Sequence, residues 1–248
     1  MISATPGNDR FAYLHARIAE KSGNYEAAPV LIVALGDSVT QGYTFHATID
    51  HENVHHARLK RSLEMAYPLA TFSVINAGAA GQTVPDAMAR LERDVIRHDP
   101  DLVIIGFGLN DAARGGLEGV PTFKAELAAM IDQVCEHTQA DLILLTPSFT
   151  LLEVNSNIHP DEAFYAPGLL PLQRGGVIGA YAAAIRDIGH HRNVPVADVY
   201  AAWERAAANG TNTDEWLANG LNHPTGTAHS IPARLLANLI IESAPKEN

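Results

Sequence analysis

Short, almost unbroken apolar runs recur along the chain and constrain its fold more than any other feature. Four of them, rich in Val, Ile and Leu, span residues 30–35, 72–75, 102–105 and 142–145, and a weaker fifth spans 194–197. Runs without polar alternation are typical of strands covered on both faces. The stretches between them, such as 85–97 and 122–138, carry apolar residues every three or four positions, as amphipathic helices do. This order predicts an α/β fold: a three-layer α/β/α sandwich with a central, mainly parallel five-stranded sheet.

The 248-residue chain has no linker, internal repeat or low-complexity tract that would mark a domain boundary. With 47% hydrophobic residues it is long enough to bury one large core. We therefore expect a single domain over residues 1–248, with an N-terminal helical extension at 1–29. Residues 147–176 contain several prolines and a Gly175-Gly176 pair. Because long loops at the carboxyl edge of a sheet often act as lids, we expect this segment to be an active-site loop.

Charge and hydropathy limit the partners of the protein. The formal net charge is −11 and no run of Lys and Arg stands out, which argues against nucleic-acid binding. The apolar runs are too short to span a membrane, and residues 1–10 lack the pattern of a secretory signal. We expect a cytoplasmic protein, or a secreted one if a leader has been removed; the sequence carries no signal for the oligomeric state. The lone cysteine, Cys135, lies in a helical pattern and is expected to be a packed small hydrophobe.

A serine and a histidine stand where a nucleophile and its base would be expected. The first apolar run leads directly into Gly36-Asp37-Ser38. A serine at such a strand-to-helix turn presents its hydroxyl at the mouth of the sheet, although a helix cap explains Ser38 equally well. His223 lies in a loop before the last predicted helix, at 228–241. Histidine is the usual base for a serine proton, because its intrinsic pKa is about 6.5.

Two further strand ends carry groups that stabilise negative charge. The second run is followed by Gly81, whose backbone N–H can approach a substrate closely because glycine has no side chain. The third run is followed by Asn110, whose side-chain NH₂ can donate to an oxyanion. An Asx turn is the structural alternative for Asn110.

Together these segments resemble the conserved blocks of the SGNH/GDSL hydrolases, a family of esterases and lipases. Gly-Asp-Ser at 36–38, Gly81, Gly-Leu-Asn-Asp at 108–111 and His223-Pro224 stand in the family order, and the resemblance covers about residues 30–241. It implies the flavodoxin-like SGNH sandwich and a small-molecule acyl ester as substrate, with no metal or organic cofactor. It further implies that Ser38 is the nucleophile and His223 the general base and acid. The backbone N–H groups of Ser38 and Gly81 and the side chain of Asn110 would form the oxyanion hole.

The chain departs from the family pattern at one position. The family usually has an aspartate three residues before the histidine to hold its ring, and here that residue is Gly220. Three side chains are candidates for the orienting role: Asn219 through its carbonyl oxygen, Asp214 and Asp198. A Ser-His dyad that uses a backbone carbonyl is the other possibility.

The motifs of two other hydrolase classes fit the sequence less well. An α/β-hydrolase needs Gly two residues after its nucleophile, and position 40 is Thr. His51-Glu52-Asn53-Val54-His55 matches the H-E-x-x-H zinc motif, so a zinc hydrolase is a lesser alternative. Arg58 and Arg61 stand where a metzincin would have Gly and a third His. The histidines between positions 46 and 56 are otherwise expected at the substrate mouth or on the surface.

These features predict a serine esterase that hydrolyses short-chain acyl esters, with acetyl preferred, and carbohydrates as one class of alcohol. The reaction would pass through an acyl-enzyme. The alternative, suggested by the missing aspartate, is a catalytically weakened SGNH-fold protein that binds carbohydrate or serves as a scaffold.

Overall fold

The computed structural model describes residues 10–245 and has one parallel sheet at its centre. Its five strands run in the order β2-β1-β3-β4-β5. They are β1 (Val30–Gly36), β2 (Phe72–Gly78), β3 (Leu102–Gly106), β4 (Asp141–Leu145) and β5 (Val196–Ala197). The five apolar runs therefore mark the five strands, and the prediction of a parallel sheet is confirmed.

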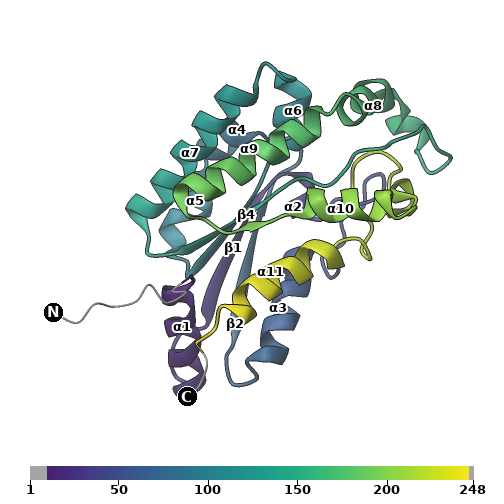
Figure 1. Ribbon diagram of the computed structural model, residues 1–248. Coiled ribbons are helices and arrows are strands. Elements are labelled where there is room, and N and C mark those ends of the chain that lie inside the picture. Colours follow the sequence, from purple (N-terminus) through teal and green to yellow (C-terminus); the bar gives the residue numbers. More distant parts are fainter. Residues whose placement is uncertain (1–9, 246–248) are drawn as a thin grey trace.

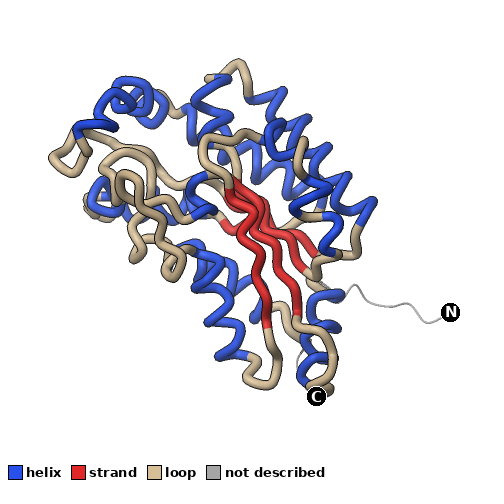
Figure 2. Tube along the Cα trace, turned by 180° about the vertical axis from the view of Figure 1, so that it is seen from behind, coloured by secondary structure: helices blue, strands red, loops and turns tan. Residues whose placement is uncertain are grey.

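Helices cover both faces of this sheet, so the molecule has three layers (Figure 1). On one face α3 and α11 pack against each other and against β2 and β5. On the other face α7 packs between α4 and α9. The bounds of these helices are α3 His55–Ala66, α4 Val84–Met88, α7 Val120–His137, α9 Val177–Arg192 and α11 Ser230–Glu242. Figure 2 shows the strands side by side with helices flanking them and long loops grouped beside one end of the sheet.

The predicted helix at 85–97 is broken into three short pieces: α4, α5 (Leu91–Asp94) and the 3₁₀ helix η1 (Ile96–His98). The interruption falls at Arg90, which lies outside the helical pieces. Its guanidinium donates hydrogen bonds to the carbonyl oxygens of Gly36 (3.2 Å) and Ala77 (2.8 Å). This arginine thus ties the carboxyl ends of β1 and β2 together, a role that periodicity alone does not reveal.

Cys135 is exposed on α7, so the expectation that it packs in the core is wrong. The buried face of α7 consists of Phe123, Leu127, Met130, Ile131 and Val134. Cys135 is the next residue after this face and has turned towards solvent, because successive helical residues are about 100° apart.

The segment 147–176 contains more regular structure than a loop. It includes the 3₁₀ helix η2 (Pro160–Tyr165) and α8 (Ala166–Arg174). Pro160 and Pro167 stand in the first turns of these two helices, where a missing N–H costs nothing. The remaining helices are α1 (Ala12–Gly23), α2 (Ser38–Gln41), α6 (Leu109–Gly115), α10 (Val199–Ala208) and η3 (Thr213–Trp216).

The first and last described helices meet at the amino-terminal edge of the sheet. In α1, Arg17 donates to Asp101 (2.8 Å), which immediately precedes β3. His15 of the same helix lies 3.1 Å from the hydroxyl of Ser243, just after α11. Figure 1 shows α1 and the end of α11 close together on this side of the molecule. Among residues 10–245, no helix is long and apolar enough to cross a bilayer.

Candidate active site

Ser38 is held at the carboxyl end of β1 by a tight turn. Asp37 caps α2 by accepting a hydrogen bond from the N–H of Val39 (2.9 Å), and α2 begins at Ser38. The helix lies directly on β2, because a Cβ at Gly78 would be 2.1 Å from the backbone nitrogen of Gln41. Glycine at position 78 therefore allows the close approach that fixes the height of Ser38 above the sheet.

His223 reaches Ser38 from the other end of the chain. Its Nε2 lies 2.9 Å from the Oγ of Ser38, although the two residues are 185 positions apart. The ring of Tyr43 packs against the imidazole with ring centroids 4.7 Å apart. Burial lowers the pKa of His223 to about 4, against an opposing effect of the negative charge of Glu162. The imidazole is thus neutral at neutral pH, as a general base must be.

Asn219 contacts the far side of the imidazole, but with its amide nitrogen. The Oδ1 of Asn219 accepts hydrogen bonds from three backbone N–H groups, those of Leu221 (3.1 Å), Asn222 (3.0 Å) and His223 (3.0 Å). These three contacts fix the orientation of the amide and direct its NH₂ to the Nδ1 of His223, 2.9 Å away. Of the candidates for the orienting role, Asn219 thus contacts the ring, but through its amide nitrogen and not through its carbonyl oxygen.

The two aspartates that were considered for the same role make their hydrogen bonds elsewhere. Asp214 accepts from the N–H groups of Leu152 (2.8 Å) and Glu153 (2.9 Å) and so anchors the start of the 147–176 segment. Asp198 pairs with Arg186 at 2.6 Å and caps α10. Within the described chain, neither carboxylate hydrogen-bonds to His223.

The three expected oxyanion donors lie around the same pocket as Ser38 and His223. Among the described residues, no protein group accepts a hydrogen bond from the N–H of Ser38 or Gly81. Gly81 has a φ of 74°, a conformation that favours glycine. The NH₂ of Asn110 already donates to the carbonyl oxygen of Gln82 (3.0 Å) and to Asp37 (3.3 Å). Asn110 must therefore give up one of these bonds to donate to an oxyanion.

Asp37 is a buried acid next to Ser38. Burial raises the pKa of Asp37 to about 7, and the nearby charge of Asp111 adds to this effect. Asp111 itself accepts from the N–H groups of Val84 (3.0 Å) and Gly108 (3.1 Å). The two carboxyl groups thus organise the turns at the carboxyl edge, a role that the sequence alone did not assign to them.

The pocket in front of Ser38 is open and about 490 Å³ in volume. Its wall combines residues that follow β1, β2 and β3 with η2, the start of α8 and the loop before α11. Besides Ser38, Gly81, Asn110 and His223, it includes Tyr43, His46, Ala80, Leu109, Ala113, Asp161, Glu162, Phe164, Tyr165, Leu169, Asn219 and Asn222. The 147–176 segment therefore forms one wall of the pocket.

Glu162 is a functional candidate that sequence reasoning missed. It is only 7% exposed although it lies in a polar segment. Its Oε1 accepts from the hydroxyl of Tyr43 (3.2 Å) and contacts the Nδ1 of His46 (3.3 Å), and its Oε2 accepts from the NH₂ of Asn219 (3.1 Å). No local pattern distinguishes Glu162 from an ordinary surface glutamate, because all three partners are distant in sequence.

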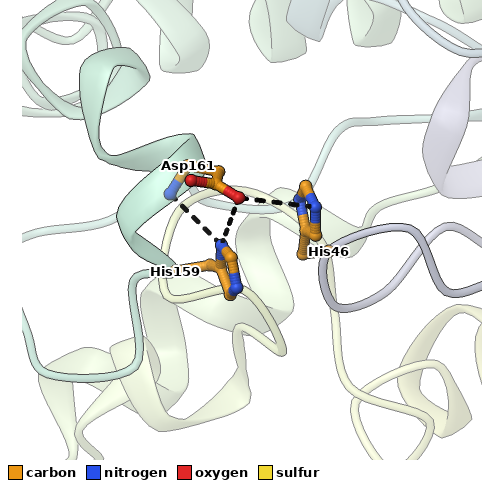
Figure 3. Close-up of side chains that lie close together, drawn as sticks. All are labelled: His46, His159 and Asp161. Atoms are coloured by element: carbon orange, nitrogen blue, oxygen red, sulfur yellow. Dashed lines mark hydrogen bonds and ion pairs between the residues drawn. The ribbon is translucent and has the colours of Figure 1, made fainter.

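Three residues at the rim of the pocket could offer ligands to a metal ion. His46, His159 and Asp161 each have one ligand atom within 4.8 Å of the others. Figure 3 shows the carboxylate of Asp161 beside both rings, which are parallel with centroids 4.3 Å apart. The Nδ1 of His159 already accepts the N–H of Asp161 (3.2 Å), and the Nδ1 of His46 faces Glu162. The Nε2 of His46 is therefore left for a ligand role, whereas His159 would have to release its bond from Asp161 before its Nδ1 could bind a metal.

The H-E-x-x-H match does not form the helix that a zinc site of this kind needs. α3 begins at His55, whereas His51 lies in the turn before it and is exposed. The two histidines are therefore not one helical turn apart on the same helix. His55 is buried and packs against His56 and His229.

A family model described as "GDSL-like Lipase/Acylhydrolase family" matches residues 34–231. An acetylxylan esterase of Geobacillus stearothermophilus is 31% identical over 174 residues, which cover 69% of this chain and 74% of the esterase. An uncharacterized lipoprotein, YqeF, of Bacillus subtilis is 27% identical over 211 residues, or 81% of this chain and 83% of the lipoprotein.

Solved structures show the same fold. A lipase/acylhydrolase of Enterococcus faecalis has a TM-score of 0.66 and 27% identity, over 88% of this chain and 99% of its own. The acetylxylan esterase Axe2 of Geobacillus stearothermophilus has a TM-score of 0.66 and 24% identity, over 89% of this chain and 99% of its own. Other structures of that esterase are described as catalytic mutants, in which a serine, an aspartate or a histidine is replaced by alanine.

Proposed function

The chain belongs to the GDSL-like lipase/acylhydrolase family and is a carboxylic ester hydrolase of the SGNH kind, and from this premise we propose that Ser38 and His223 are its nucleophile and base. The observation that carries the proposal is the 2.9 Å contact between the Oγ of Ser38 and the Nε2 of His223. A hydroxyl within hydrogen-bond reach of a neutral imidazole is the arrangement that nucleophilic catalysis by serine requires. We further propose that residues 1–248 form one hydrolase domain.

The reaction would proceed in two acyl-transfer steps. Ser38 attacks the ester carbonyl while His223 takes its proton at Nε2, and the resulting oxyanion receives hydrogen bonds from the N–H groups of Ser38 and Gly81 and from the side chain of Asn110. His223 then gives the proton to the departing alcohol, which leaves an acyl-enzyme on Ser38. A water molecule, deprotonated by the same histidine, releases the acid.

We propose that the acyl group is short, with acetyl preferred, and that the alcohol is a carbohydrate. The pocket wall includes Ala80, Gly81 and Ala113, and two methyl groups and a glycine leave room for a small acyl group beside Ser38. At the rim, the exposed rings of Phe164 and Tyr165 lie with centroids 4.0 Å apart. Exposed aromatic rings beside polar groups are suited to the apolar faces and hydroxyls of a sugar. The relative named as an acetylxylan esterase supports this substrate class.

Hydrolysis of p-nitrophenyl acetate by the parent, Ser38→Ala and His223→Ala proteins tests the mechanism. We expect both variants to lose at least about 1,000-fold in kcat and to fall to similar residual rates, because members of one proton-transfer unit are not additive. A parent protein with no turnover above the Ser38→Ala variant would instead support the binding or scaffold alternative. A His223→Ala variant that keeps most of the activity would remove His223 from the base role.

A further inference from the structure

Position 220, three residues before His223, is where the family usually has its aspartate, and it has no room for a side chain in this protein. Gly220 has a φ of 68°, which disfavours a side chain. A Cβ at this position would also lie 2.5 Å from the Oδ1 of Asn155 and 2.9 Å from the backbone nitrogen of Ile158. Both neighbours belong to the 147–176 segment. An aspartate at position 220 would therefore clash with the 147–176 segment, which packs against the loop that carries His223.

The same segment brings its own carboxylate to the site. Glu162, in η2, is buried and is hydrogen-bonded to Tyr43, His46 and Asn219. Within residues 10–245, no Lys or Arg pairs with it. Burying a carboxylate without a permanent cation is costly, and such a group is retained where its charge is used.

The contacts connect this charge to the base of the proposed reaction. The Oε2 of Glu162 accepts from the NH₂ of Asn219 at 3.1 Å, and the same amide nitrogen lies 2.9 Å from the Nδ1 of His223. One amide group thus separates the carboxylate from the imidazole.

We propose that Glu162 is the acidic positioning residue of the site and supplies to His223, across Asn219, the negative charge that the family's aspartate would otherwise provide. The inference rests on the proposed roles of Ser38 and His223. It assigns to the 147–176 segment a part in the proton transfer as well as in forming the pocket wall.

Proton transfer explains why a carboxylate is needed here. In the structure Nδ1 accepts from the N–H of Asn219, so the ring proton is on Nε2, which faces Ser38. To take the Ser38 proton, the ring must first change tautomer: Nε2 gives its proton to solvent, Nδ1 takes one from solvent, and the NH₂ of Asn219 turns away from Nδ1. When the Oγ–H bond of Ser38 breaks and an N–H bond forms at Nε2, the ring becomes an imidazolium with N–H groups on both sides. Glu162 is then the acid whose negative charge compensates the positive charge of the ring.

The electrostatic surroundings of His223 are consistent with this role. The ring faces Ser38, the phenol of Tyr43 and the amide of Asn219, while His229 lies close enough at the start of α11 for the two imidazoles to influence each other. Glu162 is the group whose charge raises the pKa of His223 against the stronger effect of burial.

Glu162→Gln tests the inference, with Glu153→Gln as the matched control. Glu153 lies in the same segment, is exposed, and undergoes the same change of charge. For Glu162→Gln we expect kcat on p-nitrophenyl acetate to fall about 10- to 100-fold while KM changes less than about twofold, because the charge acts in the transition state through one intervening group. The acid limb of the pH profile of kcat/KM should also move to lower pH, since His223 loses the charge that raises its pKa. Glu153→Gln should match the parent in both.

A double variant gives a rescue that a purely structural role would not produce. In Glu162→Gln/Asn219→Asp the carboxylate and the amide exchange places, so the acid lies directly at Nδ1 while the three backbone N–H groups keep their acceptor. We expect this protein to recover at least about tenfold in kcat over Glu162→Gln and to have an acid limb at higher pH than the parent.

Two results would overturn the inference: a folded Glu162→Gln protein with parental kcat and pH profile, or a double variant no better than the single one. Circular dichroism and thermal unfolding establish that the variants are folded; if Glu162→Gln does not fold, the double variant and its pH profile decide. Ser38→Ala separates this inference from the proposed function. If Ser38→Ala is inactive while Glu162→Gln is not impaired, the role of Glu162 fails and the serine mechanism stands.

Discussion

At the scale of single residues, three glycines define the edge on which the site is built. Gly36 of β1 is paired with Gly78 of β2 and with Gly106 of β3, so the three stand at the same level of the sheet. A Cβ at Gly36 would lie 2.1 Å from the Oγ1 of Thr40 in α2. Gly36 and Gly78 have no room for a side chain because the helix that carries Ser38 occupies the space.

Replacement of one of these glycines should therefore affect both stability and activity. We expect Gly78→Ala to cost about 1–3 kcal/mol of unfolding free energy and to lower kcat at least about tenfold, because the added methyl group displaces α2 and with it Ser38. Urea unfolding and p-nitrophenyl acetate hydrolysis measure the two effects. Gly23→Ala is the control, since a Cβ there meets nothing within 4 Å. If Gly78→Ala keeps the parental unfolding free energy and kcat, the added methyl group is accommodated without displacing Ser38, and this expectation is wrong.

The residues of the site differ in how far the sequence could predict them. Ser38 and His223 were identified from motifs, and the structure places them 2.9 Å apart. Asn219 was one of several candidates for a contact with His223, and which end of its amide faces the ring could not be predicted. That choice depends on three backbone N–H groups of the same loop, and so on a loop conformation that no local pattern specifies. Glu162 was missed because its partners come from three other parts of the chain.

At the scale of elements, the 147–176 segment departs most from the sequence-based expectation. It was expected to be a loop over the site, and it contains η2 and α8, both of which line the pocket. Clusters of proline favour a loop prediction, yet proline is also common in the first turn of a helix. Likewise, the periodic pattern at 85–97 did not reveal the break at Arg90. At Arg90 the long-range contacts with Gly36 and Ala77 coincide with the end of the helix.

The aromatic pair of this segment allows a test of the proposed substrate class. We expect Phe164→Ala to raise KM for an acetylated xylo-oligosaccharide about 5- to 10-fold, the effect of losing about 1 kcal/mol of stacking. The ring is 68% exposed, so kcat on p-nitrophenyl acetate should change less than about twofold. Steady-state kinetics on the two substrates provide the comparison. Equal effects on both substrates, or none on either, would argue against a sugar at this rim.

At the scale of the whole molecule, the fold followed from the sequence and the buried histidines did not. The parallel sheet was predicted because apolar runs covered on both faces are visible without any tertiary information. His55 is 2% exposed, His56 is 5% and His229 is fully buried, and they gather between α3 and the start of α11. Both ring nitrogens of His55 and of His229 lack a hydrogen-bond partner among the described residues. Polar side chains in a core are the hardest feature to predict, because composition assigns them to the surface.

These histidines should make the protein sensitive to acid. Burial lowers the pKa of His56 to about 4, that of His229 to about 3 and that of His55 well below its usual value of 6.5. The unfolded chain therefore binds more protons than the folded one below pH 6.5, so stability is fully present above that pH and is lost as the pH falls towards 4. Asp37, with its pKa raised to about 7, has the opposite and smaller effect, since it is one group against these three and His223, whose pKa burial also lowers to about 4.

Thermal or urea unfolding between pH 7.5 and 4.5 tests this expectation. Each net proton contributes a slope of about 1.4 kcal/mol per pH unit, so a decline of about 2 kcal/mol or more is expected between pH 6.5 and 5. His55→Leu should flatten the profile, whereas His190→Gln, on the exposed surface of α9, should leave it unchanged. A stability that stays constant down to pH 4.5 would contradict the assignment.

Because α1 and the end of α11 lie side by side, the protein can be attached to a solid support or a fused module from one side of the sheet. Both described ends emerge at the amino-terminal edge of the strands, and Ser38 follows the carboxyl end of β1. A bead, a resin or a fused module joined through either end would consequently sit behind the sheet. The mouth of the pocket would remain turned to the surrounding solution, accessible even to a polymer too large to diffuse around the particle.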